Sequence, residues 1–378
     1  MEDMVSPEFW RGRRVMVTGH TGFKGAWLTQ WLLGLGAEVS GLALEPATVP
    51  NLYELLKLGA RVPTTFADIN DRDAVAGHLN RHRPETVFHL AAQALVRLSY
   101  EAPVDTFLTN VVGVATLLDV VRRSSDVTDV VIATSDKCYE NLERDRGYRE
   151  DERMGGHDPY SASKGCAELA VTSMRRSFFA PYAKGGHPAR IATARAGNVI
   201  GGGDWSADRL VPDIVRGCLA ADGAVRLRNP ASIRPWQHVL EPLRGYLMLA
   251  ERLAAGGSGF DEGWNFGPAA SDERPVAEVA GALVAALGRG RIVVESDLAA
   301  AHEARVLRLD TAKARARLGW TPMLGFHDAI ATTARWYSGW HGGVDALALT
   351  MRQIEDYEGA IRSFGAAQPV LARLGELP

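Results

Sequence analysis

The 378-residue sequence is poor in cysteine, has no strong excess of either charge and contains no long uncharged apolar run. Its three cysteines, Cys138, Cys166 and Cys218, are far apart, which excludes a disulfide framework and predicts free thiols in a reducing compartment. The 42 lysines and arginines are balanced by 45 acidic residues, so there is no global basic field to hold a nucleic acid or an anionic bilayer. The first ten residues also lack the apolar core of a secretion signal. We therefore expect a cytoplasmic protein that acts on a small molecule, without nucleic-acid or membrane partners.

What is present is the alternation of an α/β protein. Short apolar runs at 13–19, 38–44, 62–69, 86–90, 130–134 and 189–196 are separated by helical patterns, among them 71–82, 103–123 and 160–179. This alternation predicts a Rossmann-type doubly wound parallel sheet. After Asn198 it gives way to a glycine run and scattered prolines, with helices expected at 277–287, 311–318, 325–340 and 344–364 and a strand at 291–294. We predict a dinucleotide-binding domain over 1–199 and a smaller mixed α/β substrate lobe over 200–378, parts of which return to the first domain.

Glycines recur every three residues directly after the first predicted strand. In a strand-to-helix turn of this kind, the first glycine allows the tight turn, the second lets the backbone approach a pyrophosphate, and the third lets the helix pack closely on the strand. The amino end of the helix also favours an anion. The residues expected to bind the dinucleotide here are Gly19, Thr21, Gly22, Phe23, Lys24 and Gly25.

Acidic residues follow the next two predicted strands. Glu45 stands twenty positions after Gly25, where a carboxylate would bind the ribose hydroxyls, and no arginine adjoins it, which favours NAD over NADP. A solvated loop glutamate is the alternative interpretation. Asp68 and Ile69 close the third strand and are expected at the adenine, although Asp68 could equally cap the helix that follows.

Tyr160 and Lys164 are four residues apart, hence one helical turn apart on one face. A tyrosine with an ordinary pKa of about 10 becomes a useful base near neutral pH only if a cation stabilises its phenolate, and Lys164 can supply that cation. A packed tyrosine beside a surface lysine is the alternative. With the glycine loop in the same chain, the spacing favours a catalytic pair.

From the glycine loop through Leu90-Ala91-Ala92-Gln93, Asn110 and Tyr160-x-x-x-Lys164, the chain resembles the extended short-chain dehydrogenase/reductase family. The resemblance implies that Leu90, Ala91, Ala92, Asn110, Tyr160 and Lys164 contact NAD, that Gln93 contacts substrate, and that Ser135 binds the sugar hydroxyl being oxidised. In the family's sugar-nucleotide 4,6-dehydratases an acidic residue follows this hydroxyl residue and takes part in eliminating water. Asp136 occupies that position here.

Most of these dehydratases have Asp-Glu where this chain has Asp136-Lys137. In this difference the chain resembles the family's CDP-glucose 4,6-dehydratases. It also resembles them in the segments at 19–25, 154–160, 196–205 and 234–239, and the likeness runs from about Trp10 to Tyr357. It implies an internal redox cycle: a hydride passes from sugar C4 to NAD, water is eliminated across C5 and C6, and the hydride returns to C6. A nucleotide-sugar 4-epimerase, a dehydratase for another nucleotide sugar, and a silent NAD-binding protein are the alternatives.

The resemblance also assigns roles to single residues. Tyr160 would take the C4 hydroxyl proton, and Asp136 would be the acid for the departing C6 hydroxyl, with a pKa raised by burial. Lys137 is either a neutral base for the C5 proton, which burial and nearby positive charge favour, or a cation that stabilises the enolate. The residues expected at the substrate besides Gln93 and Ser135 are Asn198, Arg209, Arg234 and His238. The histidines have no metal-ligand spacing, so we expect no metal site, and we expect a homo-oligomer, a dimer or a tetramer.

Overall fold

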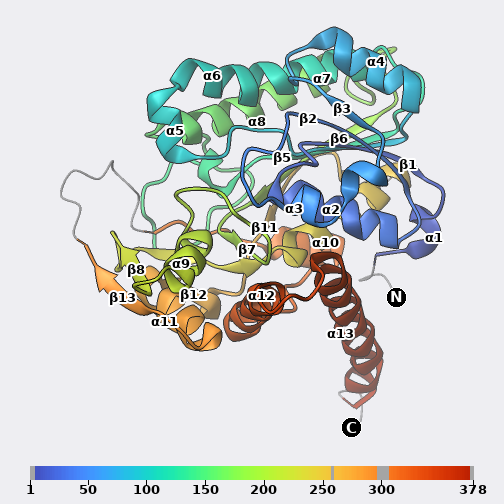
Figure 1. Ribbon diagram of the computed structural model, residues 1–378. Coiled ribbons are helices and arrows are strands. Elements are labelled where there is room, and N and C mark those ends of the chain that lie inside the picture. Colours follow the sequence, from blue (N-terminus) through green and yellow to red (C-terminus); the bar gives the residue numbers. More distant parts are fainter. Residues whose placement is uncertain (1–4, 257–258, 296–305, 375–378) are drawn as a thin grey trace.

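The computed structural model describes residues 5–256, 259–295 and 306–374 (Figure 1). A seven-stranded parallel sheet lies at its centre, in the order β11-β6-β5-β4-β1-β2-β3. The strands are β1 (Arg14–Thr18), β2 (Glu38–Ala43), β3 (Thr64–Phe66), β4 (Thr86–His89), β5 (Asp129–Ala133), β6 (Arg190–Ala196) and β11 (Gly263–Phe266). The order reverses between β1 and β4, as in a doubly wound sheet. The predicted fold class is confirmed, although the strand expected at 62–69 is only three residues long.

Helices cover both faces of the sheet. One face carries α4 (Arg72–His82), α7 (Gly113–Val121) and α8 (Pro159–Phe178), which share a core with strand residues such as Met16 and Val87. The other face carries α2 (Phe23–Gly34) and α10 (Leu240–Ala254), whose core includes Val15 and Val17. Because alternate residues of a buried strand point to opposite faces, both faces of β1 must be apolar. β11 and α10 come from beyond residue 200, so the central domain is not made from residues 1–199 alone.

The segment expected to be helical over 103–123 is a continuous stack of three pieces. These are α6 (Pro103–Phe107), a π-helical turn (Leu108–Val112) and α7, preceded by α5 (Val96–Glu101). By length and composition alone, Pro103–Val121 could cross a membrane. In the structure α7 packs against α4 and α8, and Leu117 and Leu118 are fully buried in the core of the sheet. The apolar face of α7 is therefore explained by packing.

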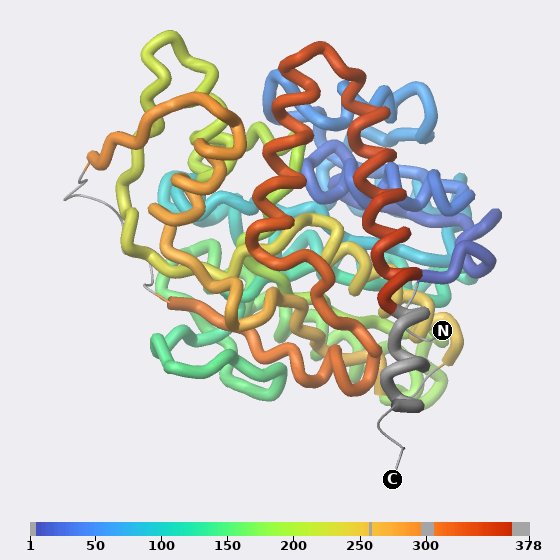
Figure 2. Tube along the Cα trace, turned by 90° about the horizontal axis from the view of Figure 1, so that it is seen from below, coloured from blue at the N-terminus to red at the C-terminus, as the bar shows by residue number. Residues whose placement is uncertain are grey.

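The remaining elements form a lobe below the carboxyl ends of the strands (Figure 1). It holds three two-stranded pairings, β7 with β10, β9 with β12 and β8 with β13, and Figure 2 shows α12 and α13 lying side by side. Its strands are β7 (Val199–Ile200), β8 (Ala224–Leu227), β9 (Ile233–Pro235), β10 (Gln237–His238), β12 (Glu273–Pro275) and β13 (Arg291–Val294). Its helices are α9 (Leu210–Leu219), α11 (Val276–Leu287), α12 (Phe326–His341) and α13 (Ala346–Leu374).

Two short helices are α1 (Pro7–Trp10) and α3 (Leu52–Leu55). Short 3-10 turns lie at Leu58–Ala60, Asp136–Cys138 and Ala270–Asp272, and π-helical turns lie at Leu108–Val112 and Ala314–Leu318. The helix predicted at 311–318 ends in the last of these turns. The three cysteines are free, as predicted, and Cys138 and Cys218 are buried.

Candidate active site

A cavity of about 830 Å³ lies at the carboxyl ends of the central strands, between the sheet and the second lobe. This is where open α/β sheets bind ligands, because the chain leaves successive strands on opposite sides of the sheet there. Most of the predicted site residues line this cavity. They are Gly19, Thr21, Gly22, Phe23, Lys24, Gly25, Glu45, Asp68, Ile69, Leu90, Ala91, Ala92, Gln93, Ser135, Asp136, Lys137, Tyr160, Lys164, Asn198, Arg209 and Arg234. The structure thus brings together residues that follow six strands of the sheet, residues of α2, α8 and β9, and the N-cap of α9.

The glycine loop has the geometry of an anion cradle. Gly19 has a φ of +70°, and a Cβ there would lie 2.7 Å from the backbone nitrogen of Ala91. A Cβ on Gly25 would lie 2.1 Å from the Gly19 carbonyl oxygen, so helix α2 can approach β1 only with glycine at that position. Gly22 is the N-cap of α2 and makes no side-chain cap bond, which leaves the positive end of the helix facing the cavity. These features fit the pyrophosphate of a dinucleotide.

Lys24 leaves this loop toward the catalytic end of the cavity. Its Nζ donates a hydrogen bond of 2.8 Å to the hydroxyl of the buried Tyr246 on α10. Burial of the ammonium, with Arg209 and Lys164 nearby and Asp136 opposing them, lowers the pKa of Lys24 to about 7. The side chain predicted to bind cofactor therefore changes its charge near neutral pH.

The expected ribose and adenine residues lie on the rim of the cavity. Glu45 and Asp68 line it and are exposed, and Ile69 is buried beneath them. The alternative role of Asp68 as a helix cap is wrong, because the N-cap of α4 is Asp71, whose side chain accepts bonds from the backbone of Asp73 and Ala74. Asp68 instead accepts hydrogen bonds from Asn70. The Asp68 carboxylate therefore stays at the cavity rim.

Ser135, Asp136 and Lys137 follow β5 on a short 3-10 turn. Ser135 is the N-cap of this turn, accepting a bond from the Lys137 backbone nitrogen, and it donates to Asp136 Oδ1 over 3.0 Å. Asp136 is 2% exposed, and its Oδ2 has no hydrogen-bond partner. Burial raises the pKa of Asp136, although the Lys137 and Arg234 cations and the Ser135 bond oppose the shift. The carboxyl thus has the environment of a group that can hold a proton.

A glycine on the neighbouring strand makes room for this carboxyl. A Cβ on Gly197, just after β6, would lie 1.8 Å from Asp136 Oδ2. A carboxyl in this orientation therefore requires glycine at position 197. The sequence showed Gly197 only as part of a string, since nothing in it indicates which side chain the glycine faces.

Tyr160 and Lys164 occupy the first turns of α8. Asp158 caps this helix through the Ser161 backbone nitrogen, and Pro159 is its first residue, both favourable at a helix start. The Lys164 Nζ lies 6.0 Å from the centre of the Tyr160 ring. Burial raises the pKa of Tyr160 to about 12, against a hydrogen bond with Ser135, and burial lowers the pKa of Lys164 to about 8, against the charge of Glu168. The predicted pair is assembled beside Ser135.

Arginines line the second-lobe side of the cavity. Arg209 lies 3.6 Å from Asp204, and Arg234 is buried and donates to the Ile233 carbonyl. Arg97 and Arg228, which sequence reasoning missed, also line the cavity, and both pair with Asp208. No motif distinguishes them from other surface arginines, so only the folded chain identifies them.

Two predicted contacts need correction, because His238 and Asn110 do not line the cavity. His238 does not line the cavity: it is buried against Trp27, and burial lowers its pKa to about 3. Asn110 lies behind the cavity wall, where it bonds the Gln93 backbone and Ser163. Gln93 lines the cavity, but its side-chain amide bonds Leu95 and Thr106. Asn110 and Gln93 therefore shape the loop after β4, and their polar side-chain atoms are occupied by the protein itself.

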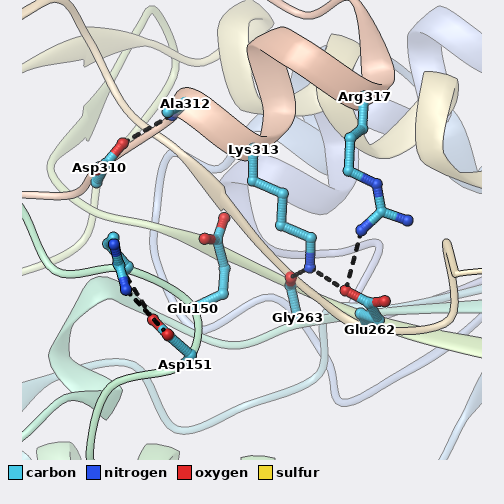
Figure 3. A pocket seen from close by; sticks show the side chains of 9 residues that line it. Glu150, Asp151, Glu262, Gly263, Asp310, Ala312, Lys313 and Arg317 are labelled. Atoms are coloured by element: carbon cyan, nitrogen blue, oxygen red, sulfur yellow. Dashed lines mark hydrogen bonds and ion pairs between the residues drawn. The ribbon is translucent and has the colours of Figure 1, made fainter.

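A second cavity of about 440 Å³ lies away from these residues (Figure 3). It is lined by charged side chains that already pair with one another: Lys313 and Arg317 with Glu262, and Arg149 with Asp151. Across residues 5–256, 259–295 and 306–374, no cluster of three or more His, Cys, Asp or Glu side chains could hold a metal ion. The larger cavity is therefore the candidate active site.

Comparison with known proteins agrees with this geometry. The sequence pattern of the family described as GDP-mannose 4,6 dehydratase matches residues 16–333. A CDP-glucose 4,6-dehydratase of Salmonella typhimurium is 47% identical over 94% of this chain and 99% of its own length. The structure of DesIV, a dTDP-glucose 4,6-dehydratase from Streptomyces venezuelae with NAD and TYD bound, is 26% identical, with a TM-score of 0.72 over 88% of this chain and 99% of its own.

A UDP-glucose 4-epimerase from Thermotoga maritima is 21% identical over 86% of this chain and 99% of its own, with a TM-score of 0.73, a likeness that shows the fold alone. The family match covers most of the chain, and the Salmonella relative matches nearly all of it. The chain therefore belongs to the GDP-mannose 4,6 dehydratase family of extended short-chain dehydrogenases/reductases.

Proposed function

We propose that this protein is an NAD-dependent 4,6-dehydratase that converts CDP-glucose to CDP-4-keto-6-deoxyglucose. The observation that carries the proposal is the buried Asp136 carboxyl, with a raised pKa, in one cavity with Ser135, Tyr160 and Lys164. A 4-epimerase needs the last three but no acid for eliminating water. The choice of CDP-glucose rests on the 47% identity to the Salmonella enzyme over nearly the whole chain.

Oxidation at sugar C4 needs a group to take the hydroxyl proton. When bound, NAD would supply the hydride acceptor for C4 and return the hydride to C6. Ser135 would orient the C4 oxygen, and the Tyr160 phenolate would take its proton. The Lys164 cation would stabilise that phenolate and bring the pKa of Tyr160 down from the value that burial alone gives. The glycine loop and Glu45 are the residues that would hold the pyrophosphate and the adenosine ribose.

Elimination needs an acid at C6 and a base at C5. Asp136 is the proposed acid, since a carboxyl with a raised pKa keeps a proton to give to the departing hydroxyl. Lys137 lines the same cavity one residue along and is half-buried, and we propose that it takes the C5 proton and returns a proton to C5 when the hydride reaches C6. The cationic alternative, in which Lys137 stabilises the enolate, leaves the proton transfer to another group.

A Lys137→Met variant separates these roles. It should still transfer hydride and give bound NADH, while exchange of the C5 proton with solvent deuterium falls sharply. Lys137→Glu provides the contrast, because it restores a carboxylate base and removes a cation. Exchange at the wild-type rate in Lys137→Met would show that Lys137 is not the base and would favour the cationic role.

The substrate is tested with CDP-, dTDP-, UDP- and GDP-glucose in parallel. CDP-glucose should have the highest kcat/KM, and the product should develop the ultraviolet chromophore of a 4-keto-6-deoxy sugar in alkali. A higher kcat/KM for another nucleotide would replace CDP-glucose as the substrate. An isomeric sugar without the chromophore would show an epimerase.

We also propose a cytoplasmic homo-oligomer. Apolar side chains are exposed along neighbouring helices of one face: Leu98 on α5, Val104 on α6, and Leu169 on α8. Exposed apolar patches of this kind often mark protein interfaces. Light scattering of the purified protein should give a dimer or a tetramer, and a monomer at micromolar concentration would refute the oligomer. Three free cysteines are consistent with a reducing compartment.

A further inference from the structure

Glu168 is a buried carboxylate of α8 that the proposed chemistry does not use. It stands one turn after Lys164 and two turns after Tyr160, and its side chain is 4% exposed. Each of its oxygens accepts two hydrogen bonds. Oε1 accepts from Arg195 Nε over 2.9 Å and from Thr134 Oγ1 over 2.5 Å, and Oε2 accepts from Arg195 Nη2 over 2.9 Å and from Thr193 Oγ1 over 2.7 Å. All four acceptor positions of the carboxylate are therefore occupied by the protein.

These bonds join the two halves of the catalytic site. Thr134 directly precedes Ser135 and Asp136, whereas Glu168 shares α8 with Tyr160 and Lys164. Arg195, on the intervening strand β6, extends the network through a 2.6 Å bond to the Tyr139 hydroxyl, which in turn donates to Asn265 on β11. The ends of three adjacent strands are thus tied to the helix that carries the catalytic pair.

The same carboxylate acts on Lys164 through space. Burial lowers the pKa of Lys164, and Glu168 is the strongest of the groups that oppose this, followed by Cys138 on the 3-10 turn. Two further titratable groups face Lys164 from other elements: His89 on β4, which burial keeps neutral, and Lys24 on α2. Arg195 and the two threonines keep Glu168 itself ionised, with a pKa below its usual range. The negative charge is therefore permanent at working pH.

We propose that Glu168 is a positioning residue of the catalytic site, which clamps α8 to the end of β5 and places a fixed negative charge one turn from Lys164. The proposal rests on the proposed roles of Tyr160 and Lys164. It makes Glu168 more than a buried ion pair, because a purely structural pair would affect stability without affecting how the catalytic lysine titrates.

The test is Glu168→Gln, which keeps the shape and removes the charge. At an effective dielectric constant of about 20, a unit charge about 6 Å away shifts a pKa by about two units. The Lys164 titration, followed by NMR of 13C-labelled lysine and assigned with Lys164→Met, should therefore move down by about one to two pH units. The alkaline limb of the pH–rate profile should move with it. Glu168→Asp should leave the titration near its wild-type position while kcat falls through misplacement.

Asp129→Asn is the matched control. Asp129 is also fully buried and paired with an arginine, Arg13 Nη2 at 2.6 Å, but it begins β5, at the end away from the site. The Asp129→Asn variant should lower the melting temperature without moving the Lys164 titration. If Glu168→Gln folds poorly because Arg195 is left unpaired, the double variant Glu168→Gln/Arg195→Gln removes both charges and should shift the Lys164 titration in the same direction by a smaller amount, because a nearby cation is lost as well.

The proposal would be overturned if Lys164 titrates at its wild-type pH in both Glu168→Gln and Glu168→Gln/Arg195→Gln. The NMR titration needs no sugar nucleotide, so it remains decisive even if CDP-glucose is not the substrate. A protein that fails to dehydrate CDP-glucose but shows the shifted titration would refute the proposed substrate and keep the role of Glu168.

Discussion

Replacing Gly197 by alanine tests the role of Asp136 without changing any titratable group. The added methyl carbon would lie 1.8 Å from Asp136 Oδ2, whereas ordinary van der Waals contact begins at 3.4 Å, so the two atoms must separate by about 1.6 Å. Asp136 is 2% exposed and its side chain is short, so the carboxyl has little room to retreat. The displacement therefore falls on the group proposed to protonate the C6 hydroxyl.

The magnitude follows from the geometry of proton transfer. A misplacement of about 1 Å can cost about 100-fold in rate, and general acid catalysis contributes about 10²- to 10⁴-fold. Gly197→Ala should therefore slow elimination at least about 100-fold. Crowding of a packed site should also cost about 1 to 3 kcal/mol of stability.

The assay separates oxidation from elimination in a single turnover. Formation of bound NADH should continue in Gly197→Ala, while release of the 4-keto-6-deoxy product stalls. Gly267→Ala is the control, because Gly267 follows the neighbouring strand β11 and its added methyl would meet only ordinary contacts, the nearest at 3.5 Å. Elimination within about threefold of wild type in Gly197→Ala, or an equal loss in both variants, would refute the reasoning.

Three further predictions concern single groups and pH. Tyr160→Phe should lower C4 oxidation by about 10²- to 10⁴-fold while CDP-glucose still binds, and a loss below about tenfold in rapid-mixing experiments would contradict the base role. Lys24→Met should weaken NAD binding, most of all below pH 7, because the pKa of Lys24 is about 7 and its cation extends from the loop expected to hold the anionic pyrophosphate; calorimetry showing unchanged or tighter NAD binding in the variant would exclude this attraction. The free energy of unfolding should fall as the pH drops from about 6.5 toward 4, because the unfolded chain then protonates buried histidines that stay neutral in the folded protein, at about 1.4 kcal/mol per pH unit for each. These histidines, with pKa values of about 3 to 4, are His20, His78, His89 and His238. Urea unfolding that gives equal stability at pH 7 and pH 5 would contradict the last prediction.

Local patterns determined the fold class and the ends of the cavity. The apolar strands, the glycine loop at 19–25 and the Tyr160–Lys164 spacing each depend on residues a few positions apart. They can therefore be recognised in the sequence without the structure. A parallel sheet then forces the residues after its strands to one edge, which is why Glu45, Ser135 and Asn198 meet in one cavity although the chain separates them widely. Glu168 also had a local signal, since it continues the four-residue spacing beyond Lys164, but that signal does not reveal its partners.

Tertiary structure alone decided which distant side chains touch. The Lys24–Tyr246 hydrogen bond joins residues 222 positions apart, and the contact between Gly197 and Asp136 depends on how two neighbouring strands end. The same holds for His238, which a string in the sequence assigned to the substrate and the fold buried against Trp27. The spacing of residues along one helix or strand determines only on which side of that element each side chain lies. Burial and long-range contacts, and therefore the pKa values of Asp136, Lys164 and Lys24, arise only when the elements pack together.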